Sequence, residues 1–471
     1  MPIIVNNIPE NSTNLFLTKL LIFIKIWEFI IFFCQLIHFV SFISNSVKLN
    51  EMKKKIFKLI ILFLIIIASI FVGSSSQKMS ALSKKIWTIS ERYYYFSLKK
   101  IGLTNLSKKI DNAKIITHED NKYSKVKGNS FSVIFSKIKS FPGRTASILL
   151  EKNENEEIEY EIFTQDGFII KKNNISEINF PSLFYSNTGV RSVFVVDDEY
   201  FALSGFVTNA CKYATLFRIT DGKNLLKSKC LPDITRVDFD GLGGAYVKIE
   251  DSILLSIGTP VHTSEKISKL AQVKESIFGK IILIKNKEFH NFEKENINYS
   301  IYSLGHRNPQ GLVQYEDNIF SLEHGPQGGD ELNQIIKGKN YGWPISSFGT
   351  RYSDGKSYPK IYSNLSYEEP LFAMLPSVAP SALNLCPENL SNYYKPYNCL
   401  IGLSLKERSI LIFVLNTNNS KVIIFEKIKL GGRLRHFGLD KAGKLFVNNT
   451  GHFYISMDKD GLYKIKFDNF R

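Results

Sequence analysis

Hydrophobic and polar residues follow a short-range pattern along most of the chain. From about residue 130 onward, short runs of β-branched and aromatic residues alternate with turn signals. The runs cover residues 145–150, 158–164, 167–171, 192–196, 200–206, 214–219, 245–249, 252–257, 280–284, 312–315, 318–322, 409–415, 421–427, 436–439, 444–447 and 461–465. Several neighbouring runs are joined by turns such as Asp166-Gly167 and Asp460-Gly461. Evenly spaced hairpins with little helical periodicity predict an all-β fold, and over residues 128–471 they favour a β-propeller.

The N-terminal part has a different pattern, because apolar stretches at residues 26–43 and 59–72 open the chain. The second stretch follows Lys53, Lys54, Lys55 and Lys58. A charged region ahead of an apolar region is the order found in an export signal. Residues 51–75 are therefore predicted to be a signal peptide or a retained signal anchor. The protein begins either at Met1 or at Met52.

The first apolar stretch is long enough to span a bilayer. It carries three polar residues that are costly at bilayer depth, Glu28, Gln35 and His38. Residues 1–50 are therefore either a first membrane span or an upstream extension, so that one or two hydrophobic helices precede the propeller. The lysine-rich loop between the stretches should stay cytoplasmic. The C-terminal part is then expected in the periplasm or on the extracytoplasmic face, either membrane-anchored or exported after cleavage.

Composition and charge narrow the classes of protein. Apolar residues make up 44% and charged residues 22% of the chain, which is typical of a globular protein. The formal net charge of +16 alone would suggest nucleic acid as a partner. However, residues 76–127 hold twelve lysines and arginines against four acidic residues. We interpret this segment as a basic juxtamembrane linker or helix near anionic lipid, and we expect no nucleic-acid binding.

Four of the five cysteines lie in the predicted propeller. Cys211 and Cys230 flank the turn signal at residues 220–223, which lies midway between them, and Cys386 and Cys399 bracket a short loop. This spacing predicts the disulfides 211–230 and 386–399 in an oxidising compartment. Four buried free thiols are the alternative, since cysteine also behaves as a small hydrophobic residue.

The segment 302–344 holds the densest group of residues that can carry chemistry, YSLGHRNPQGLVQYEDNIFSLEHGPQGGDELNQIIKGKNYGWP. Arg307 offers a planar fork for a carboxylate, and Asn308 offers an amide donor. Gly325 and Pro326 can leave backbone carbonyls unpaired. The carboxylates of Asp330 and Glu331 are hard oxygen ligands, which Ca²⁺ prefers together with carbonyls. A structured glycine-rich loop with salt bridges is the alternative.

This segment resembles the pyrroloquinoline quinone (PQQ)-dependent glucose/sorbosone and aldose sugar dehydrogenase family. The family pattern GHRNPQG, EHGP-x-GGDE-x-N and G-x-NYGWP is matched almost throughout, with Gln327 at a position that is commonly basic. Weaker similarities follow in PSVAPS at residues 376–381, LIGLSLKERS at 400–409 and GRLR at 432–435. The resemblance implies a six-bladed β-propeller with the quinone near its axis.

The resemblance also implies roles for individual residues. Arg307 and Asn308 would contact PQQ, whose carboxylates would be neutralised by Lys406, Arg433 and Arg435. Gly325 and Pro326 would present carbonyls to the Ca²⁺ that polarises the quinone, and Glu331, Asp330 and the carbonyl of Tyr341 would form a second, structural Ca²⁺ site. Arg433 and Arg435 flank Leu434 and so face one side of a strand, where two like charges require an anion or a carboxylate nearby.

One element of the family pattern is missing. The family places a His three residues before Gly-Arg-Leu or Gly-Arg-Ile, as the general base that takes the hydroxyl proton. The corresponding segment is DGLGGAY at residues 240–246, where the position of the His falls on Asp240 or Gly241. Of these two residues only Asp240 can act as a base, if burial raises its pKa toward the working pH.

Two functions therefore compete. The first is a PQQ- and Ca²⁺-dependent dehydrogenase that oxidises an aldose sugar and passes electrons to a quinone or cytochrome acceptor. The second is a non-catalytic propeller that binds a glycan or a protein partner. Convergence of Arg307, Lys406, Arg433 and Arg435 on one pocket would favour the enzyme, whereas cations that point to solvent would favour the binding module.

Overall fold

The structure is a computed structural model. It describes residues 116–117 and 123–470, except 173, 183, 185–188, 209–210, 232–238, 261–263, 292–295 and 361–366. The predicted N-terminal spans, the signal or anchor and most of the basic linker lie outside these residues. Within the described part, no helix is long and apolar enough to cross a membrane.

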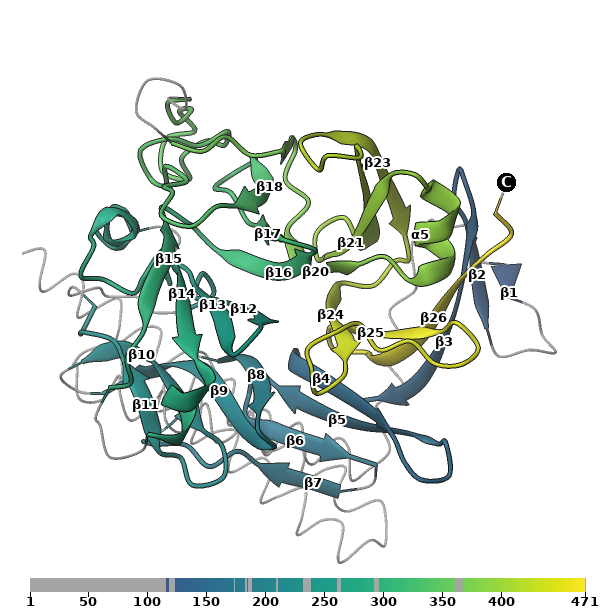
Figure 1. Ribbon diagram of the computed structural model, residues 1–471, viewed down its shortest axis with the longest axis horizontal. Coiled ribbons are helices and arrows are strands. Elements are labelled where there is room, and N and C mark those ends of the chain that lie inside the picture. The colour runs from purple at the N-terminus through teal and green to yellow at the C-terminus, as the bar shows by residue number, and fades with distance from the viewer. Residues whose placement is uncertain are drawn as a thin grey trace, which may run out of the picture. The chain divides into compact units, whose positions relative to one another are not determined.

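Antiparallel sheets make up the described part of the chain, arranged around a common centre (Figure 1). Four of these sheets consist of consecutive hairpins. The first holds β8 (Val190–Val196), β9 (Glu199–Val207), β10 (Lys212–Arg218) and β11 (Asn224–Lys227). The second holds β12 (Gly243–Ile249), β13 (Ser252–Ile257), β14 (Lys280–Lys285) and β15 (Ser300–Leu304). The third holds β16 (Pro309–Tyr315), β17 (Asn318–Glu323), β18 (Asp330–Ile335) and β19 (Phe372–Met374).

A fourth sheet holds β20 (Pro380–Leu385), β21 (Asn398–Ser404), β22 (Ser409–Leu415) and β23 (Val422–Lys429). A ten-stranded sheet unites both ends of the described chain. Its order is β1 (Ile116–Thr117), β2 (Ser124–Lys127), β3 (Ser132–Ser140), β26 (Gly461–Asp468), β25 (Phe453–Met457), β24 (Leu434–Leu439), β4 (Thr145–Lys152), β5 (Ile158–Thr164), β6 (Phe168–Lys171) and β7 (Asn174–Glu177). The C-terminal strand β26 pairs with β3, and β24 pairs in parallel with β4, so the last strands close against the first ones.

The strands nearest the centre position the candidate site. β4, β8, β12, β16, β20 and β24 all contribute residues to one narrow cavity of about 60 Å³ between them. Apolar clusters fill the space between neighbouring sheets, with fully buried residues such as Phe194, Phe320 and Phe413. Because strands such as β8 and β22 are mostly apolar and are buried along their whole length, both faces of a sheet can pack on its neighbours. The described fold is thus an all-β, propeller-like arrangement.

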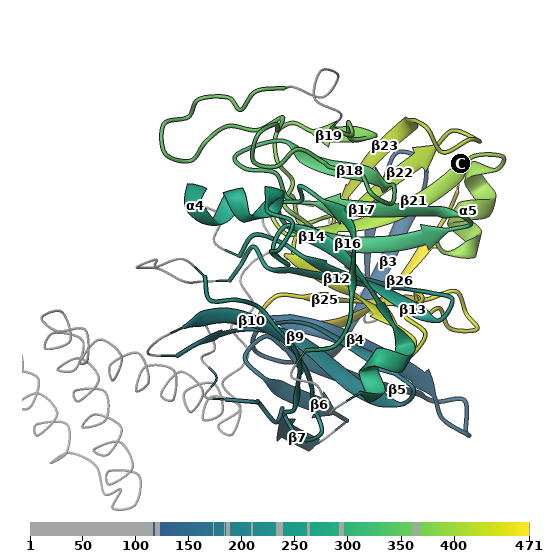
Figure 2. The ribbon, with the colours of Figure 1, turned by 60° about the vertical axis from the view of Figure 1, so that its left-hand side comes forward.

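Short helices lie outside the sheets (Figure 2). They are α4 (Glu265–Ser268), η1 (Lys269–Gln272), η2 (Asn286–His290) and α5 (Glu388–Tyr394). The η1 turn is held by Lys280, a fully buried residue whose Nζ donates to the carbonyls of Leu270, Ala271 and Phe278 at 2.9–3.0 Å. Burial lowers the pKa of Lys280 to about 8.

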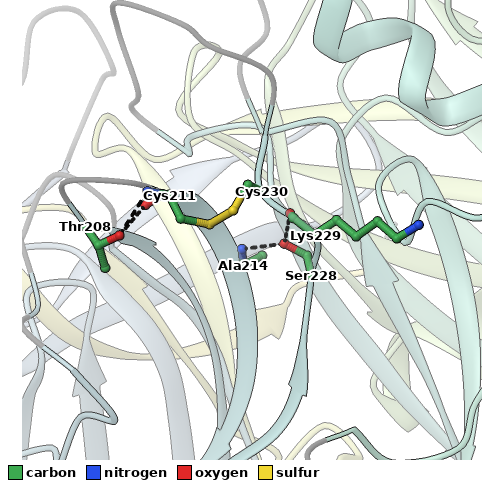
Figure 3. The surroundings of a disulfide bond; sticks show 6 residues. All are labelled: Thr208, Cys211, Ala214, Ser228, Lys229 and Cys230. Atoms are coloured by element: carbon green, nitrogen blue, oxygen red, sulfur yellow. Dashed lines mark hydrogen bonds between the residues drawn. A yellow bond between two sulfur atoms is a disulfide. The ribbon is translucent and has the colours of Figure 1, made fainter.

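Both predicted disulfides are confirmed. Cys211 and Cys230 are bonded across β10 and the segment after β11, with Cα atoms 5.2 Å apart (Figure 3). Cys386 and Cys399 are bonded with Cα atoms 5.4 Å apart. The alternative of four free thiols is therefore wrong.

Two details differ from the sequence interpretation. β2 already pairs with β3, so the sheet includes residues assigned to the basic linker. Residues 444–447 form only the isolated bridges of Leu445 with Leu439 and of Val447 with Phe453, because this run lies in the connection between β24 and β25.

Candidate cofactor and active site

A buried imidazole fixes the loop between β15 and β16. His306 is fully buried, its Nδ1 lies 3.2 Å from Glu323 Oε1, and its Nε2 lies 2.8 Å from Ser303 Oγ. Its ring stacks on Tyr341 with the centroids 4.6 Å apart. Glu323 Oε2 also accepts the backbone N–H of Arg307 at 3.1 Å. Because both ring nitrogens of His306 are engaged, this residue positions the loop rather than serving as a base.

Arg307 is enclosed by aromatic rings and backbone. Its Nη1 donates to the carbonyl of His324 at 3.2 Å, and its guanidinium lies 5.4 Å from the Trp343 ring and 6.0 Å from the Tyr352 ring. The residue is only 5% exposed, and burial lowers its pKa. Its buried Nε has no hydrogen-bond partner among the described residues. A buried guanidinium with an unused donor fits a bound carboxylate, since charge-assisted hydrogen bonds to arginine are strong.

Asn308 connects this loop to the turn before β12. Its Oδ1 accepts from the backbone N–H of Gly243 at 3.1 Å and from Gln310 Nε2 at 2.7 Å. Its Nδ2 lies at a long 3.5 Å from the carbonyl of Asp240. The amide oxygen is therefore engaged within the protein, and the Nδ2 group is the part of Asn308 that can serve a ligand.

Asp240 lies at the turn before β12, beside a buried arginine. Its side chain is 52% exposed, and its Oδ1 lies 3.3 Å from Nη2 of Arg191. A Cβ atom placed on Gly241 would lie 2.3 Å from the carbonyl oxygen of Thr259, so position 241 accepts only glycine. If the missing histidine has a functional counterpart in this turn, the counterpart is therefore Asp240.

The paired arginines of the GRLR segment share one carboxylate. Arg435, on β24, binds Asp458 through Nε and through Nη2, the latter at 2.6 Å, and Arg433 Nε lies 3.5 Å from the same carboxylate. Burial alone would raise the pKa of Asp458. Hydrogen bonding to Arg435 and the positive charges of Arg435, Arg144 and Arg433 nevertheless hold this pKa below its usual value. The carboxylate that two like charges require is thus Asp458.

His324 lies within the electrostatic influence of two of the predicted cations. Burial lowers its pKa, and the charges of Arg307 and Arg435 lower it further, while Asp330 opposes them. Arg307, in the loop between β15 and β16, and Arg435, on β24, therefore both act on this imidazole. Lys406 is exposed in the turn between β21 and β22. Its assignment to the cofactor stays a prediction.

The first predicted calcium ligands lie in the loop between β17 and β18. Asp330 is fully buried, and both of its oxygens accept hydrogen bonds. The donors are the backbone N–H of Gly325 at 3.0 Å, Ser377 Oγ at 2.6 Å and the backbone N–H groups of Val378 and Ala379, each at 2.7 Å. The carboxylate thus anchors the loop before β20, and the carbonyls of Gly325 and Pro326 are the better candidates for an ion.

Glu331 lies opposite Glu323 in the β17–β18 ladder. Asn333 Nδ2 donates to both carboxylates, at 2.7 Å to Glu323 and 3.3 Å to Glu331, while its buried Oδ1 has no hydrogen-bond partner among the described residues. Two buried carboxylates beside an unused amide oxygen are hard donors that suit Ca²⁺. The described part of the chain has no group of three His, Cys, Asp or Glu side chains around one point, so carbonyl oxygens such as that of Tyr341 would have to complete the shell.

Two residues of the site were not predicted from the sequence. Arg191 is a single charge within β8, whose residues are all buried, and that isolated charge is a signal that could have revealed it. It lines the central cavity together with Gln310 and His436. Asp458 gives no such signal, because it becomes a partner of Arg435 only when β24 and β25 pair.

Comparison with known proteins agrees with this geometry. The model of the Glucose / Sorbosone dehydrogenase family matches residues 236–454. Residues 236–454, just under half of the chain, are thus similar to the glucose/sorbosone dehydrogenase family. An uncharacterised protein of Synechocystis is 33% identical over 212 residues, which cover 42% of this chain and 50% of that protein. The aldose sugar dehydrogenase YliI of Escherichia coli is 29% identical over 223 residues, which cover 45% of this chain and 55% of the enzyme.

The fold is similar to that of a solved structure. The apo-form structure of the soluble aldose sugar dehydrogenase from Escherichia coli superposes with a TM-score of 0.53 at 20% identity, covering 71% of this chain and 99% of that chain. In sequence, the chain spans about half the length of the curated relatives it matches. The fold is therefore shared, and the family and the activity are the subject of a proposal.

Proposed function

We propose that this protein is a PQQ- and calcium-dependent dehydrogenase of an aldose sugar, which passes electrons to a quinone or cytochrome acceptor outside the cytoplasm. The observation that carries the proposal is Arg307, a buried guanidinium with an unused Nε beside the imidazole on which Arg435 also acts. The six strands that line the central cavity support a six-bladed propeller. The two disulfides support an oxidising compartment.

The cationic residues would hold the carboxylates of the cofactor. Arg307 would use its free Nε and Asn308 its Nδ2 group. Arg433, which is 49% exposed at the side chain, can share its charge between Asp458 and a ligand, and Lys406 is an exposed cation that can turn toward one. When bound, PQQ supplies a two-electron acceptor, a chemistry that no amino-acid side chain provides.

Calcium would be held by oxygen atoms of the β17–β18 region. The carbonyls of Gly325 and Pro326 would serve the ion at the cofactor, and Glu331 with the Tyr341 carbonyl would serve a structural ion, to which we add Glu323 and Asn333. The Asp330 carboxylate would act on both sites through the loop it anchors. Removal of Ca²⁺ with a chelator is expected to lower the melting temperature, since an ion bound only by the folded state stabilises that state.

The proton of the sugar hydroxyl needs an acceptor, and we assign this role to Asp240. The burial on which this role was predicted to depend is not observed, because the Asp240 carboxylate is half-exposed, and Arg191 orients it. General base catalysis contributes about 10²- to 10⁴-fold to a rate. We therefore expect Asp240→Asn to lower kcat by that factor while PQQ binding stays unchanged. An Asp240→Asn variant with wild-type kcat would exclude Asp240 as the base.

The absence of the family histidine favours a second function, a non-catalytic propeller that binds a glycan or a protein partner. One experiment separates the two. The protein is mixed with PQQ and Ca²⁺, desalted, and followed by the absorbance of the quinone while aldoses are added. Reduction of a quinone that stays with the protein supports the dehydrogenase. If the quinone elutes free, or if no aldose reduces it, the dehydrogenase is excluded and the non-catalytic binding protein is the remaining function.

A further inference from the structure

A second cavity lies beside the candidate active site. It has a volume of about 330 Å³ and is lined by α4, the start of η1 and the segment from Pro344 to Tyr358. This volume lies at the lower end of the range for small-molecule sites, roughly 300–1,000 Å³. Its η1 wall is rigid, because the buried Lys280 holds three carbonyls of that region.

The cavity shares a wall with Arg307. The Tyr352 ring, which lines the cavity, lies 6.0 Å from the Arg307 guanidinium. The Tyr358 ring also lines it and lies 5.2 Å from the Trp343 ring, which in turn lies 5.4 Å from Arg307. A molecule bound at Arg307 and a molecule in this cavity would therefore be neighbours.

Two aromatic residues that line the cavity are not fully buried in the protein core. Tyr352 is 51% exposed although it is a large ring, and Tyr358 is half-buried. Exposed tyrosines provide a flat apolar face and a polar edge, which suits a sugar ring. The sequence motifs of the family do not include these two residues, which lie beyond the NYGWP segment.

The charges of the cavity are unbalanced. Arg351 lies over the Tyr358 ring at 5.5 Å, and no carboxylate of the described residues forms an ion pair with it or with the exposed Lys269. Glu265 is the acidic residue of the wall, while Asp354 on the same loop pairs with Lys356. A stacked guanidinium is held in place to bind a carboxylate through two parallel hydrogen bonds.

We propose that this cavity binds a sugar unit that carries a carboxylate, with the ring on Tyr352 and the carboxylate on Arg351 and Lys269. The inference rests on the proposed function. It implies that the substrate is an acidic oligosaccharide, in which one unit binds in this cavity and the neighbouring unit is oxidised beside Arg307. The binding step itself needs neither cofactor nor turnover.

Calorimetric titration of the full chain without PQQ tests the proposal, with digalacturonate and cellobiose as the acidic and neutral probes. Digalacturonate is expected to bind at least about tenfold more tightly than cellobiose, and Arg351→Gln is expected to remove this preference, because a charge-assisted pair is lost. Lys269→Gln should weaken digalacturonate binding less, and Tyr352→Ala should weaken both probes. Lys356→Gln on the same loop is the matched control and should change neither.

The opposite results are equally clear. Equal binding of the two probes, no binding of either, or a preference that survives Arg351→Gln would overturn the proposal. The dehydrogenase activity is tested separately, by measuring the reduction of the quinone with monomeric aldoses. If the protein binds digalacturonate through Arg351 but retains no PQQ, this inference is supported and the proposed function is wrong.

Discussion

Arg307 and Arg435 are both buried arginines of the candidate site, yet their surroundings differ. Arg307 lies among Trp343, Tyr352 and one backbone carbonyl, and its Nε is unused among the described residues. Arg435 is engaged by both oxygens of Asp458, whose side chain is only 5% exposed. The sequence motifs assign both residues to the binding of the cofactor. The structure shows that one of them has free capacity for a ligand, while the other already has its counter-ion.

This difference separates binding from stability. A ligand can bind the Nε of Arg307 without breaking an existing contact. The free energy of the new hydrogen bond therefore contributes directly to the affinity for the ligand. A ligand of Arg435 must compete with Asp458 or extend an existing pair. We therefore expect mutations near Arg435 to change mainly the free energy of unfolding, and mutations of Arg307 to change mainly the affinity for an anionic cofactor.

The largest effect is expected for Asp458→Ala. The substitution leaves the charge of Arg435 buried without its partner, which typically costs about 3–5 kcal/mol. Urea unfolding followed by circular dichroism would measure the loss. Asp354→Ala, which removes the exposed partner of Lys356, is the matched control and should cost less than about 1 kcal/mol. Equal losses for the two variants would show that Asp458 carries no special weight.

Arg307→Met should produce the next largest effect, and on a different observable. Loss of a charge-assisted hydrogen bond is expected to weaken PQQ binding about 10- to 100-fold, which equilibrium dialysis would measure. The melting temperature should fall less than in Asp458→Ala, because methionine fills the volume and removes a buried charge. Arg218→Met, at the end of β10 beside Asp221, is the control for a lost arginine elsewhere. Unchanged PQQ affinity in Arg307→Met would remove the main support for the proposed function.

The fold was predictable because its signals are local. Alternating runs joined by Gly and Asp turns predicted most hairpins, and β5 and β13 have the expected bounds. The turn midway between Cys211 and Cys230 predicted a disulfide for the same reason. β2 was missed because its single apolar residue, Val126, lies between two lysines, so that its composition resembles a linker.

The site was predictable only where a motif carries it. Arg307 and Asn308 were found through GHRNPQG, but nothing in that motif reveals which of their atoms are already engaged. The partnership of Arg435 with Asp458 joins two strands, and the contact of Asp240 with Arg191 joins two sheets. Such contacts depend on the closed arrangement of the sheets, which local patterns do not encode.

The ion pair between Asp458 and Arg435 also makes the stability of the fold depend on pH. The folded-state pKa of Asp458 is held below its usual value, so the ion pair contributes fully above the unfolded pKa of about 3.9. The contribution is lost as the pH falls through the folded value. The stability advantage of the wild type over Asp458→Asn should therefore be constant near neutral pH and should shrink below about pH 4. Urea unfolding of both proteins across this range tests the sign, and an advantage that grows with acidification would contradict it.

The smallest effect on stability is expected for Arg433→Gln. This variant tests whether Arg433 behaves like Arg307, as a ligand-binding residue, or like Arg435, as a partner of Asp458. The side chain is 49% exposed and its Nε lies 3.5 Å from Asp458, so the pair should be worth at most about 1 kcal/mol to stability. If Arg433 also serves the cofactor, as its motif implies, PQQ affinity should fall while the unfolding free energy barely changes. Arg433 would then behave like Arg307 although it lies beside Arg435. If the variant instead loses stability and keeps its PQQ affinity, Arg433 serves mainly to stabilise the fold, as Arg435 does. Arg307 would then be the sole arginine of the GHRNPQG and GRLR motifs that is free to bind the cofactor.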